Sequence, residues 1–227
     1  MTTQATNLDV NLTVVQRNVD LTFSVPEGQT LALLGSNGSG KTTTLLALAG
    51  WLIPDSGHAR LADTVLFDCP APAAKPRVWV PAVDRGIGYL SQNHHLFPHL
   101  SAHENIMYGM DRAGIVGRKA RKGKAAEWLE RVGLAGYGKR KPGQLSGGQA
   151  QRVAIARVLA SGPRLVLLDE PLAALDVEAA PAIRQLLAEV LTDHTVVLVT
   201  HHQNDVDALA DRVHHIDPQG PTRPTAL

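Results

Sequence analysis

The segment LLGSNGSGKTTTLLALAG, residues 33–50, constrains the fold more than any other part of the 227-residue chain. It places Gly35, four intervening residues, and then Gly40, Lys41 and Thr42 between a short apolar run and an apolar helical pattern. This spacing is typical of a phosphate-binding loop, in which glycines let successive backbone N–H groups point inward and the next helix directs its positive end at the same anion. The pattern requires a buried strand before it and a helix after it, so we predict an α/β fold.

Four short apolar runs have the composition of strands that are covered on both faces. They are LALL at 31–34, IGYL at 87–90, LVLL at 165–168 and VVLV at 196–199. The N-terminal runs LDVNLTVV and VDLTFSV instead alternate apolar and polar residues, which is typical of antiparallel strands with one solvated face. The chain therefore predicts a covered sheet joined to an antiparallel one.

Helical periodicity dominates from about 101 to 159, where Ser101 and Glu104 form a capping-box pattern and Gly133 ends an amphipathic run. This region indicates a helical insert in the α/β core. The Pro/Ala-rich stretch 69–81 and the C-terminal DPQGPTRPTAL are predicted to be a loop and a frayed end.

Composition argues against several classes of protein. The single cysteine, Cys69, cannot form an intramolecular disulfide, which fits a reducing compartment. We expect no secretion signal and no membrane span, because the N-terminus lacks a basic start with an apolar run and about 18 consecutive apolar residues occur nowhere. A formal net charge of +1 and an aromatic content of 4% do not support a nucleic-acid groove.

The basic run GRKARKGK, 117–124, contains no aromatic residues, so we interpret it as a solvated surface. A nucleic-acid patch and contact with an anionic membrane leaflet stay open as alternatives. The histidines at 94, 95 and 99 lack ligand spacing on one element, and solvated loop residues are the simpler interpretation.

An acidic pair ends the third buried run, in LVLLDE. Lys41 would reach the β and γ phosphates of a nucleotide, and Thr42 together with Asp169 would hold Mg²⁺. Glu170 stands beside Asp169 as a candidate base for an attacking water. Acids at a strand end can also serve only as helix caps, but the phosphate-binding loop favours the catalytic interpretation.

Further motifs occur in a fixed order along the chain. Gln92 follows the run IGYLS, LSGGQAQR occupies 145–152 just before LLDEP, AALD ends at Asp176, and His201 follows VVLVT. With the phosphate-binding loop, these motifs resemble the ATP-binding subunits of ABC transporters over most of the chain. The resemblance implies a P-loop NTPase (RecA-like) core with an antiparallel β subdomain, within about 1–100 and 160–227, and an inserted helical subdomain at about 101–159.

The resemblance also implies roles for individual residues, with ATP and Mg²⁺ as cofactors. Catalytic roles fall to Glu170, the switch residue His201 and the Q-loop residue Gln92, and metal binding falls to Thr42, Gln92 and Asp169. Nucleotide contacts fall to Gly35, Ser36, Asn37, Gly38, Ser39, Gly40, Lys41, Thr42, Thr43, Ser146, Gly147, Gly148 and Gln149. The last four belong to the signature segment, which would complete the site of a second ATPase subunit in a head-to-tail homodimer. Two glycines at the start of a helical pattern fit an anion site that lacks its own lysine.

The runs DRGIGYLSQNHHLFPHLSAHENIMYGM and RKPGQLSGGQAQRVAIARVLA resemble the importer branch that handles molybdate, sulfate and related anions. The resemblance implies a peripheral subunit on the cytoplasmic face of the membrane, an integral membrane permease and, indirectly, a substrate-binding protein, with no nucleic-acid partner. Molybdate is the favoured cargo, while another cargo stays open. Many relatives continue into a β-rich regulatory domain, whereas this sequence ends soon after 213–216, so we expect no direct response to the anion.

The second class considered is an ABC ATPase without a transport role, which would require long coiled-coil heptads or tandem cassettes. Neither pattern occurs. One departure from the family concerns the adenine, which relatives stack on an aromatic residue in the turn between the first strands. Here that turn carries Arg17, whose guanidinium can stack on a base but can equally be an ordinary solvated turn residue, and Phe23 is expected to point into the core. We therefore predict weak base recognition.

Overall fold

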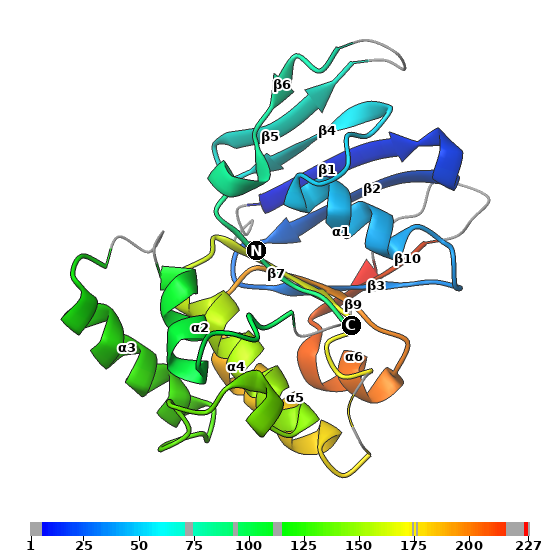
Figure 1. Ribbon diagram of the computed structural model, residues 1–227. Helices are drawn as coiled ribbons and strands as arrows, with labels where there is room; N and C mark the ends of the chain where they lie inside the picture. The colour runs from blue at the N-terminus through cyan, green and yellow to red at the C-terminus, as the bar shows by residue number, and fades with distance from the viewer. Residues whose placement is uncertain are drawn as a thin grey trace.

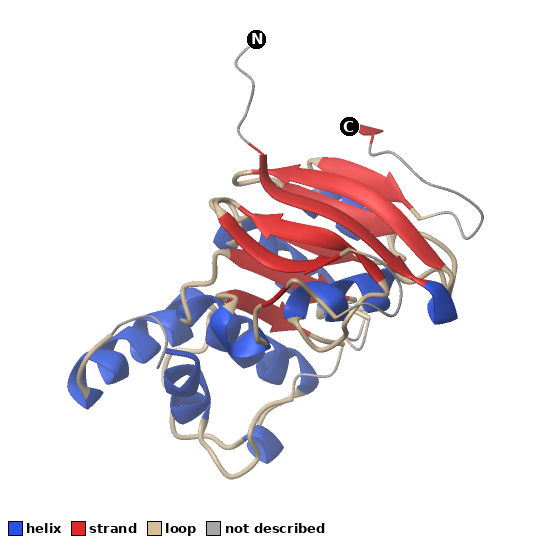
Figure 2. Cartoon of the chain, turned by 90° about the horizontal axis from the view of Figure 1, so that it is seen from above, coloured by secondary structure: helices blue, strands red, loops and turns tan. Residues whose placement is uncertain are grey.

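The computed structural model describes residues 6–70, 75–92, 95–110, 115–173, 175, 177–216 and 225–226. Its backbone is built on two sheets, with one helix among the strands and most of the others gathered on one side (Figures 1 and 2). The six-stranded sheet has the order β11-β10-β3-β9-β8-β7, and the five-stranded sheet has the order β2-β1-β4-β5-β6. No helix in the described part of the chain is both long and apolar enough to cross a membrane.

The larger sheet contains all four of the predicted buried strands, which confirms that prediction. Its parallel members are β10 (Arg212–His215), β3 (Thr30–Leu34), β9 (Val196–Val199), β8 (Leu165–Asp169) and β7 (Ile87–Leu90). Successive side chains of a strand face opposite sides of a sheet. In β8, Leu165 and Leu167 accordingly pack towards the five-stranded sheet, while Val166 and Leu168 pack towards the helices. Both faces are thus covered.

The smaller sheet is antiparallel, as the alternating N-terminal runs predict. It consists of β2 (Val19–Pro26), β1 (Thr6–Val14), β4 (Ser56–Leu61), β5 (Thr64–Cys69) and β6 (Val78–Trp79). Buried and more exposed residues alternate along β2, and Phe23 points into the core with 2% of its surface exposed. The inner face of this sheet shares one hydrophobic cluster with α1 (Lys41–Ala49) and the larger sheet.

The remaining α-helices are α2 (Ala102–Gly109), α3 (Arg118–Arg131), α4 (Gly147–Ala160), α5 (Ala180–Val190) and α6 (Gln203–Leu209). The structure also describes short 3-10 helices, namely η1 (Val15–Arg17), η2 (Ala82–Asp84) and η4 (Pro142–Gln144). The predicted capping box is present, since the Ser101 side chain accepts from the Glu104 N–H. The basic run at the start of α3 is mostly exposed, as predicted. The subdomain boundaries at 101 and 159 stay a prediction.

Two loop predictions were wrong in part. Cys69 ends β5 and is 2% exposed, and Val78 and Trp79 form β6 within the stretch that the Pro/Ala content assigned to a loop. At the C-terminus, Thr225 and Ala226 pair with β10 as β11, although the segment was expected to be frayed. The strands β6 and β11 are each two residues long and lie at the edge of a sheet. Pairing there depends on a strand that is distant in the sequence, and so short a strand leaves no periodic signal.

A buried arginine fixes the C-terminal end of α1, a feature that the sequence analysis did not anticipate. Arg85 is 1% exposed, and its Nη1 donates to the carbonyl oxygens of Ala47 and Leu48 at 2.7 Å each. Its Nε donates to the Val80 carbonyl at 2.8 Å. Burial lowers the pKa of Arg85 to about 10. The cation lies at the negative end of the helix whose other end carries the phosphate-binding loop.

Candidate functional site

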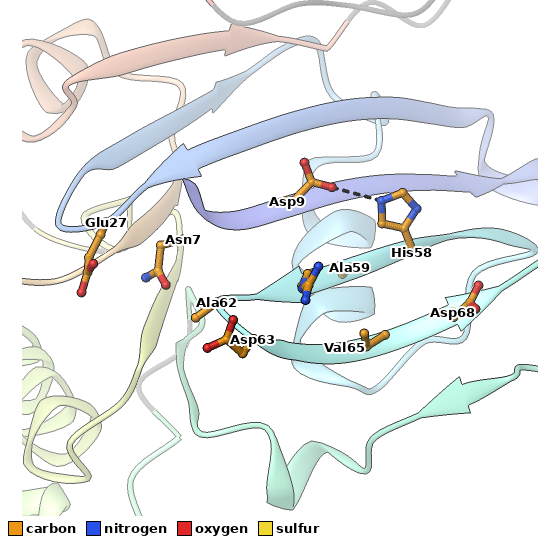
Figure 3. A pocket seen from close by; sticks show the side chains of 10 residues that line it. Asn7, Asp9, Glu27, His58, Ala59, Ala62, Asp63, Val65 and Asp68 are labelled. Atoms are coloured by element: carbon orange, nitrogen blue, oxygen red, sulfur yellow. Dashed lines mark hydrogen bonds and ion pairs between the residues drawn. The ribbon is translucent and has the colours of Figure 1, made fainter. Parts of the chain in front are cut away.

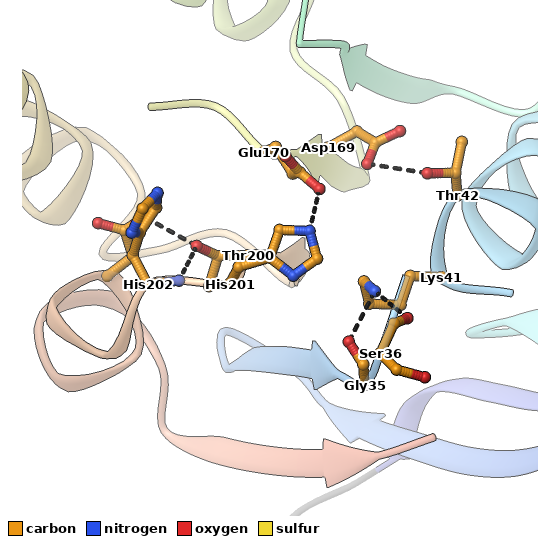
Figure 4. Close-up of polar contacts among 10 residues, drawn as sticks. Gly35, Ser36, Lys41, Thr42, Asp169, Glu170, Thr200, His201 and His202 are labelled. Atoms are coloured by element: carbon orange, nitrogen blue, oxygen red, sulfur yellow. Dashed lines mark hydrogen bonds and ion pairs between the residues drawn. The ribbon is translucent and has the colours of Figure 1, made fainter. Parts of the chain in front are cut away.

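A pocket of about 430 Å³ opens at the carboxyl edge of the parallel sheet, at the first turn of α1. Crevices at this edge are the usual ligand sites of open α/β sheets. The strands β3, β8 and β9 end here, so segments far apart in the sequence meet at one place (Figure 4). The pocket is lined by Arg17, Asn37, Gly38, Gly40, Lys41, Thr42, Thr43, Glu170 and His201.

The loop 35–40 reverses the chain between β3 and α1 with two glycines in the left-handed region. Gly38 has φ +81° and Gly40 has φ +97°. A Cβ atom at Gly40 would also collide with the side chain of Val19, which is 1% exposed in β2. Only glycine satisfies both restrictions at position 40.

The helix that follows begins without a side-chain cap, and its N-cap is Gly40. The first N–H groups of a helix have no partner within it, and they carry the positive end of its dipole. The Ser39 hydroxyl next to them is buried and has no hydrogen-bond partner within the described residues. These groups form an anion site of the kind that the sequence predicts.

Lys41 folds back over this loop (Figure 4). Its Nζ donates to the carbonyl oxygens of Gly35 at 2.8 Å and Ser36 at 2.9 Å, and the residue is 6% exposed. Burial lowers the pKa of Lys41, while the carboxylates of Glu170 and Asp169 act in the opposite direction. The ammonium is therefore preorganised beside the loop, with carboxylates favouring its charged form.

Asp169 connects three elements of the site. The Thr42 hydroxyl at the start of α1 donates to its Oδ1 at 3.3 Å, and the Tyr89 hydroxyl of β7 donates to its Oδ2 at 2.9 Å. Burial raises the pKa of Asp169, while the bonds from Tyr89 and Thr42 act to lower it. Burial also raises the pKa of Tyr89, and the neighbouring Asp169 charge adds to the effect.

Sequence reasoning missed Tyr89. Its signal was available as a hydroxyl-bearing aromatic residue three positions before Gln92 in a strand of the covered sheet. What could not be read from the sequence is that β7 is the direct neighbour of β8, the strand that carries Asp169.

Glu170 and His201 face each other from the ends of β8 and β9. The His201 Nε2 and the Glu170 Oε1 lie 2.5 Å apart (Figure 4). Glu170 has φ +49°, in a region that residues other than glycine rarely adopt. Strained backbone of this kind concentrates at functional sites, where it fixes the direction of a side chain. Here it directs the carboxylate towards the histidine and the pocket.

The donor set fits a magnesium-bound nucleotide. A hydroxyl from Thr42 and a carboxylate from Asp169 converge, and such oxygen atoms are the ligands that Mg²⁺ prefers. They stand next to the uncapped helix start and the Lys41 ammonium, which suit phosphates. Arg17 also lines the pocket, and its Nη1 donates to the Thr43 hydroxyl at 3.1 Å. Among the described residues, no three His, Cys, Asp or Glu side chains gather into a metal site of their own.

Several predicted residues lie elsewhere in the chain. Gln92 follows β7 and is exposed, and it does not line the pocket. The signature residues at the start of α4 do not line it either. Ser146 and Gln149 form a reciprocal capping box, in which the Ser146 hydroxyl accepts from the Gln149 N–H at 3.3 Å. Asp176 lies outside the described residues.

A larger hollow, of about 790 Å³, lies away from these motifs on the antiparallel sheet (Figure 3). Asp9 of β1 and His58 of β4 pair across it, with 3.0 Å between Oδ1 and Nε2. Although this hollow is larger, none of the nucleotide-binding motifs lines it, so the smaller pocket is the better candidate site.

Comparison with known proteins agrees with this geometry. The family model described as ABC transporter matches residues 19–173. The chain belongs to the ABC transporter family. A solved structure has a similar fold: a dimeric ATP-binding cassette in a post-hydrolysis state, bound to ADP and Pi. The TM-score is 0.78 and the sequences are 28% identical, and the match covers 97% of this chain and 98% of that one.

Curated relatives of this ABC protein belong to import systems. The molybdenum import ATP-binding protein ModC of Mycobacterium tuberculosis is 48% identical, covering 91% of this chain and 56% of the relative. The Fe(3+) ions import ATP-binding protein FbpC of Agrobacterium fabrum is 41% identical, covering 86% and 52%. The sulfate/thiosulfate import ATP-binding protein CysA 2 of the same organism is 40% identical, covering 86% and 54%. The chain thus spans about half the length of the relatives it matches.

Proposed function

We propose that this chain is the ATP-hydrolysing subunit of an ABC importer. The observation that carries the proposal is the convergence, in one pocket, of an uncapped helix start, a buried lysine and the facing pair Glu170 and His201. The family match supports it, and so do the import systems to which the relatives belong.

Each group has a role that follows from its position. The loop N–H groups and Lys41 bind the β and γ phosphates and offset the charge that develops during phosphoryl transfer. Glu170 accepts a proton from the attacking water, and His201 orients that carboxylate through the contact described above. Thr42 and Asp169 would hold Mg²⁺, whose charge would offset the negative charge of the phosphates. We also propose a metal contact for Gln92, although this residue does not line the pocket in the structure.

A second copy of the chain would complete the site. Ser146, Gly147, Gly148 and Gln149 lie at the N-terminus of α4, a second helix start without a lysine, and they do not line the pocket of their own chain. We propose that they contact the γ-phosphate bound to the partner copy in a head-to-tail homodimer. The dimeric state of the structural neighbour supports this arrangement.

The cargo is proposed to be a small oxyanion, with molybdate favoured. The relative with 48% identity serves molybdenum import, while relatives with about 40% identity serve Fe³⁺ or sulfate. The pocket described here binds nucleotide and leaves cargo selection to a separate permease and, indirectly, to a substrate-binding protein. We place the chain as a peripheral subunit on the cytoplasmic face of the membrane. No nucleic-acid partner is proposed.

Hydrolysis is tested with Lys41→Ala and Glu170→Gln in the full chain. Both variants should lose about 100-fold or more in kcat, because they remove a phosphate contact and the base. Glu170→Gln should still bind ATP and accumulate as an ATP-bound dimer in size-exclusion chromatography. Glu189→Gln, on the exposed side of α5, is the matched control and should keep wild-type turnover. Normal turnover in Lys41→Ala would contradict the phosphate assignment.

Transport is tested separately, by measuring molybdate uptake in cells that lack the gene. Lost uptake that wild-type protein restores and Glu170→Gln does not would support the importer role. Unchanged molybdate accumulation with lost uptake of another ion would reject the cargo and keep the importer. Copurification with DNA or ribosomes in place of a membrane protein would favour the alternative, a non-transport ABC ATPase.

A further inference from the structure

Gln151 is a buried glutamine in the signature helix to which none of the roles above has been given. It lies in α4, five residues after the N-cap Ser146, and is 1% exposed. Its Nε2 donates to the carbonyl oxygen of Pro171 at 2.5 Å. Its Oε1 is buried without a hydrogen-bond partner within the described residues. A buried amide with half of its capacity unused is costly, so its one bond calls for a reason.

The bonded carbonyl belongs to the residue directly after Glu170. Three other contacts hold the same turn. The Glu170 N–H donates to the Val199 carbonyl at 2.9 Å, the Ala173 N–H donates to the Glu170 carbonyl at 3.2 Å, and the Glu170 carboxylate meets His201. The first comes from β9, the second from the turn itself and the third from His201, two residues after the end of β9. Gln151 adds an attachment from α4.

This attachment matters because Glu170 holds a left-handed backbone, with φ +49°. Such a conformation persists only where the surroundings enforce it. A bond to the Pro171 carbonyl restrains the peptide between Pro171 and Leu172, and with it the turn that starts at Glu170. The direction of the Glu170 side chain therefore depends on where α4 lies.

We propose that Gln151 is a positioning residue that couples the signature helix to the catalytic glutamate of the same chain. The inference rests on the proposed function, in which the start of α4 contacts the nucleotide of the partner copy. A helix moves as a rigid unit over a turn or two, so a shift of its start is passed to the Pro171 carbonyl and from there to Glu170. Occupation of one ATP site would thus adjust the base of the other.

The test measures binding, turnover and cooperativity in the full chain. Gln151→Met keeps the length of the side chain and removes the donor, and Gln151→Leu removes the donor with a shorter apolar side chain. Both should bind a non-hydrolysable ATP analogue within about twofold of wild type, because the phosphate-binding loop is untouched. Their kcat should fall about tenfold, the effect of one buried hydrogen bond. Their Hill coefficient for ATP should fall towards one, from a wild-type value above one.

Gln185→Met, an exposed glutamine on α5, is the matched control and should leave all three quantities unchanged. A purely structural role of Gln151 would lower thermal stability without changing the Hill coefficient. If Gln151→Met fails to fold, Gln151→Leu carries the test. Wild-type turnover and cooperativity in a folded variant would overturn the coupling and leave the proposed function intact. Absence of ATP hydrolysis by the wild type under all conditions would instead refute the proposed function and the inference with it.

Discussion

Gly40→Ala tests whether the phosphate-binding loop depends on bare backbone at that position. An alanine at this position would have to adopt the left-handed backbone at φ +97°, and its Cβ would collide with Val19. The backbone contributes about 1–2 kcal/mol and overpacking about 1–3 kcal/mol, so the free energy of unfolding should fall by about 2–5 kcal/mol. Gly38→Ala shares the left-handed backbone, at φ +81°, but has open space around its Cβ, so only the first cost of about 1–2 kcal/mol applies.

Urea denaturation measures the free energy of unfolding of the two variants and so gives the difference between them. Titration with a fluorescent ATP analogue measures how far each change weakens nucleotide binding by the loop. Gly28→Ala is the control, since Gly28 has φ +70° and open space but lies outside the loop. It should lose stability as Gly38→Ala does and keep wild-type nucleotide affinity. Adding Val19→Ala to Gly40→Ala should recover at least about 1 kcal/mol relative to the sum of the single changes. Equal destabilisation of Gly40→Ala and Gly38→Ala, with additive double substitution, would refute the steric argument.

Three further predictions concern other positions. Arg17 stands at the turn where an aromatic residue is expected beside the base, so GTP should compete unusually well with ATP. Arg17→Ala should lower the affinity for both nucleotides, and a strong preference for ATP that survives the change would contradict this prediction. Tyr89→Phe removes a hydrogen bond to Asp169 and should raise the Mg²⁺ concentration for half-maximal nucleotide binding about tenfold, as expected for a residue that orients a metal ligand. His214 is fully buried, and burial lowers its pKa from 6.5 to about 4, so protons bind the unfolded chain preferentially. Between about pH 8 and about pH 5 the free energy of unfolding should therefore fall by about 2 kcal/mol on account of this residue, and His214→Phe should lack that component in urea titrations. If the free energies of unfolding of the wild type and His214→Phe changed with pH in parallel, this prediction would be wrong.

Short-range chemistry made much of this protein readable from its sequence. The phosphate-binding loop, the four buried strands and the Ser101 capping box each depend on residues within a few positions of one another. Backbone sterics, helix caps and the period of apolar residues act over the same short distances, so the pattern and the structure coincide. The motifs together predicted the family, because they occur in a fixed order over most of the chain.

The tertiary structure decided the contacts between distant segments. Tyr89 and Asp169 meet because β7 lies beside β8. Gln151 reaches Pro171 because α4 packs against the turn that follows β8. Arg85, which follows the antiparallel sheet in the sequence, binds the carbonyl groups at the C-terminal end of α1. The edge strands β6 and β11 likewise exist only through their neighbours. Such contacts depend on strand order and packing, which one-dimensional periodicity does not encode. The sequence therefore determined which groups the site contains, and the tertiary structure determined which side chains hold them in place.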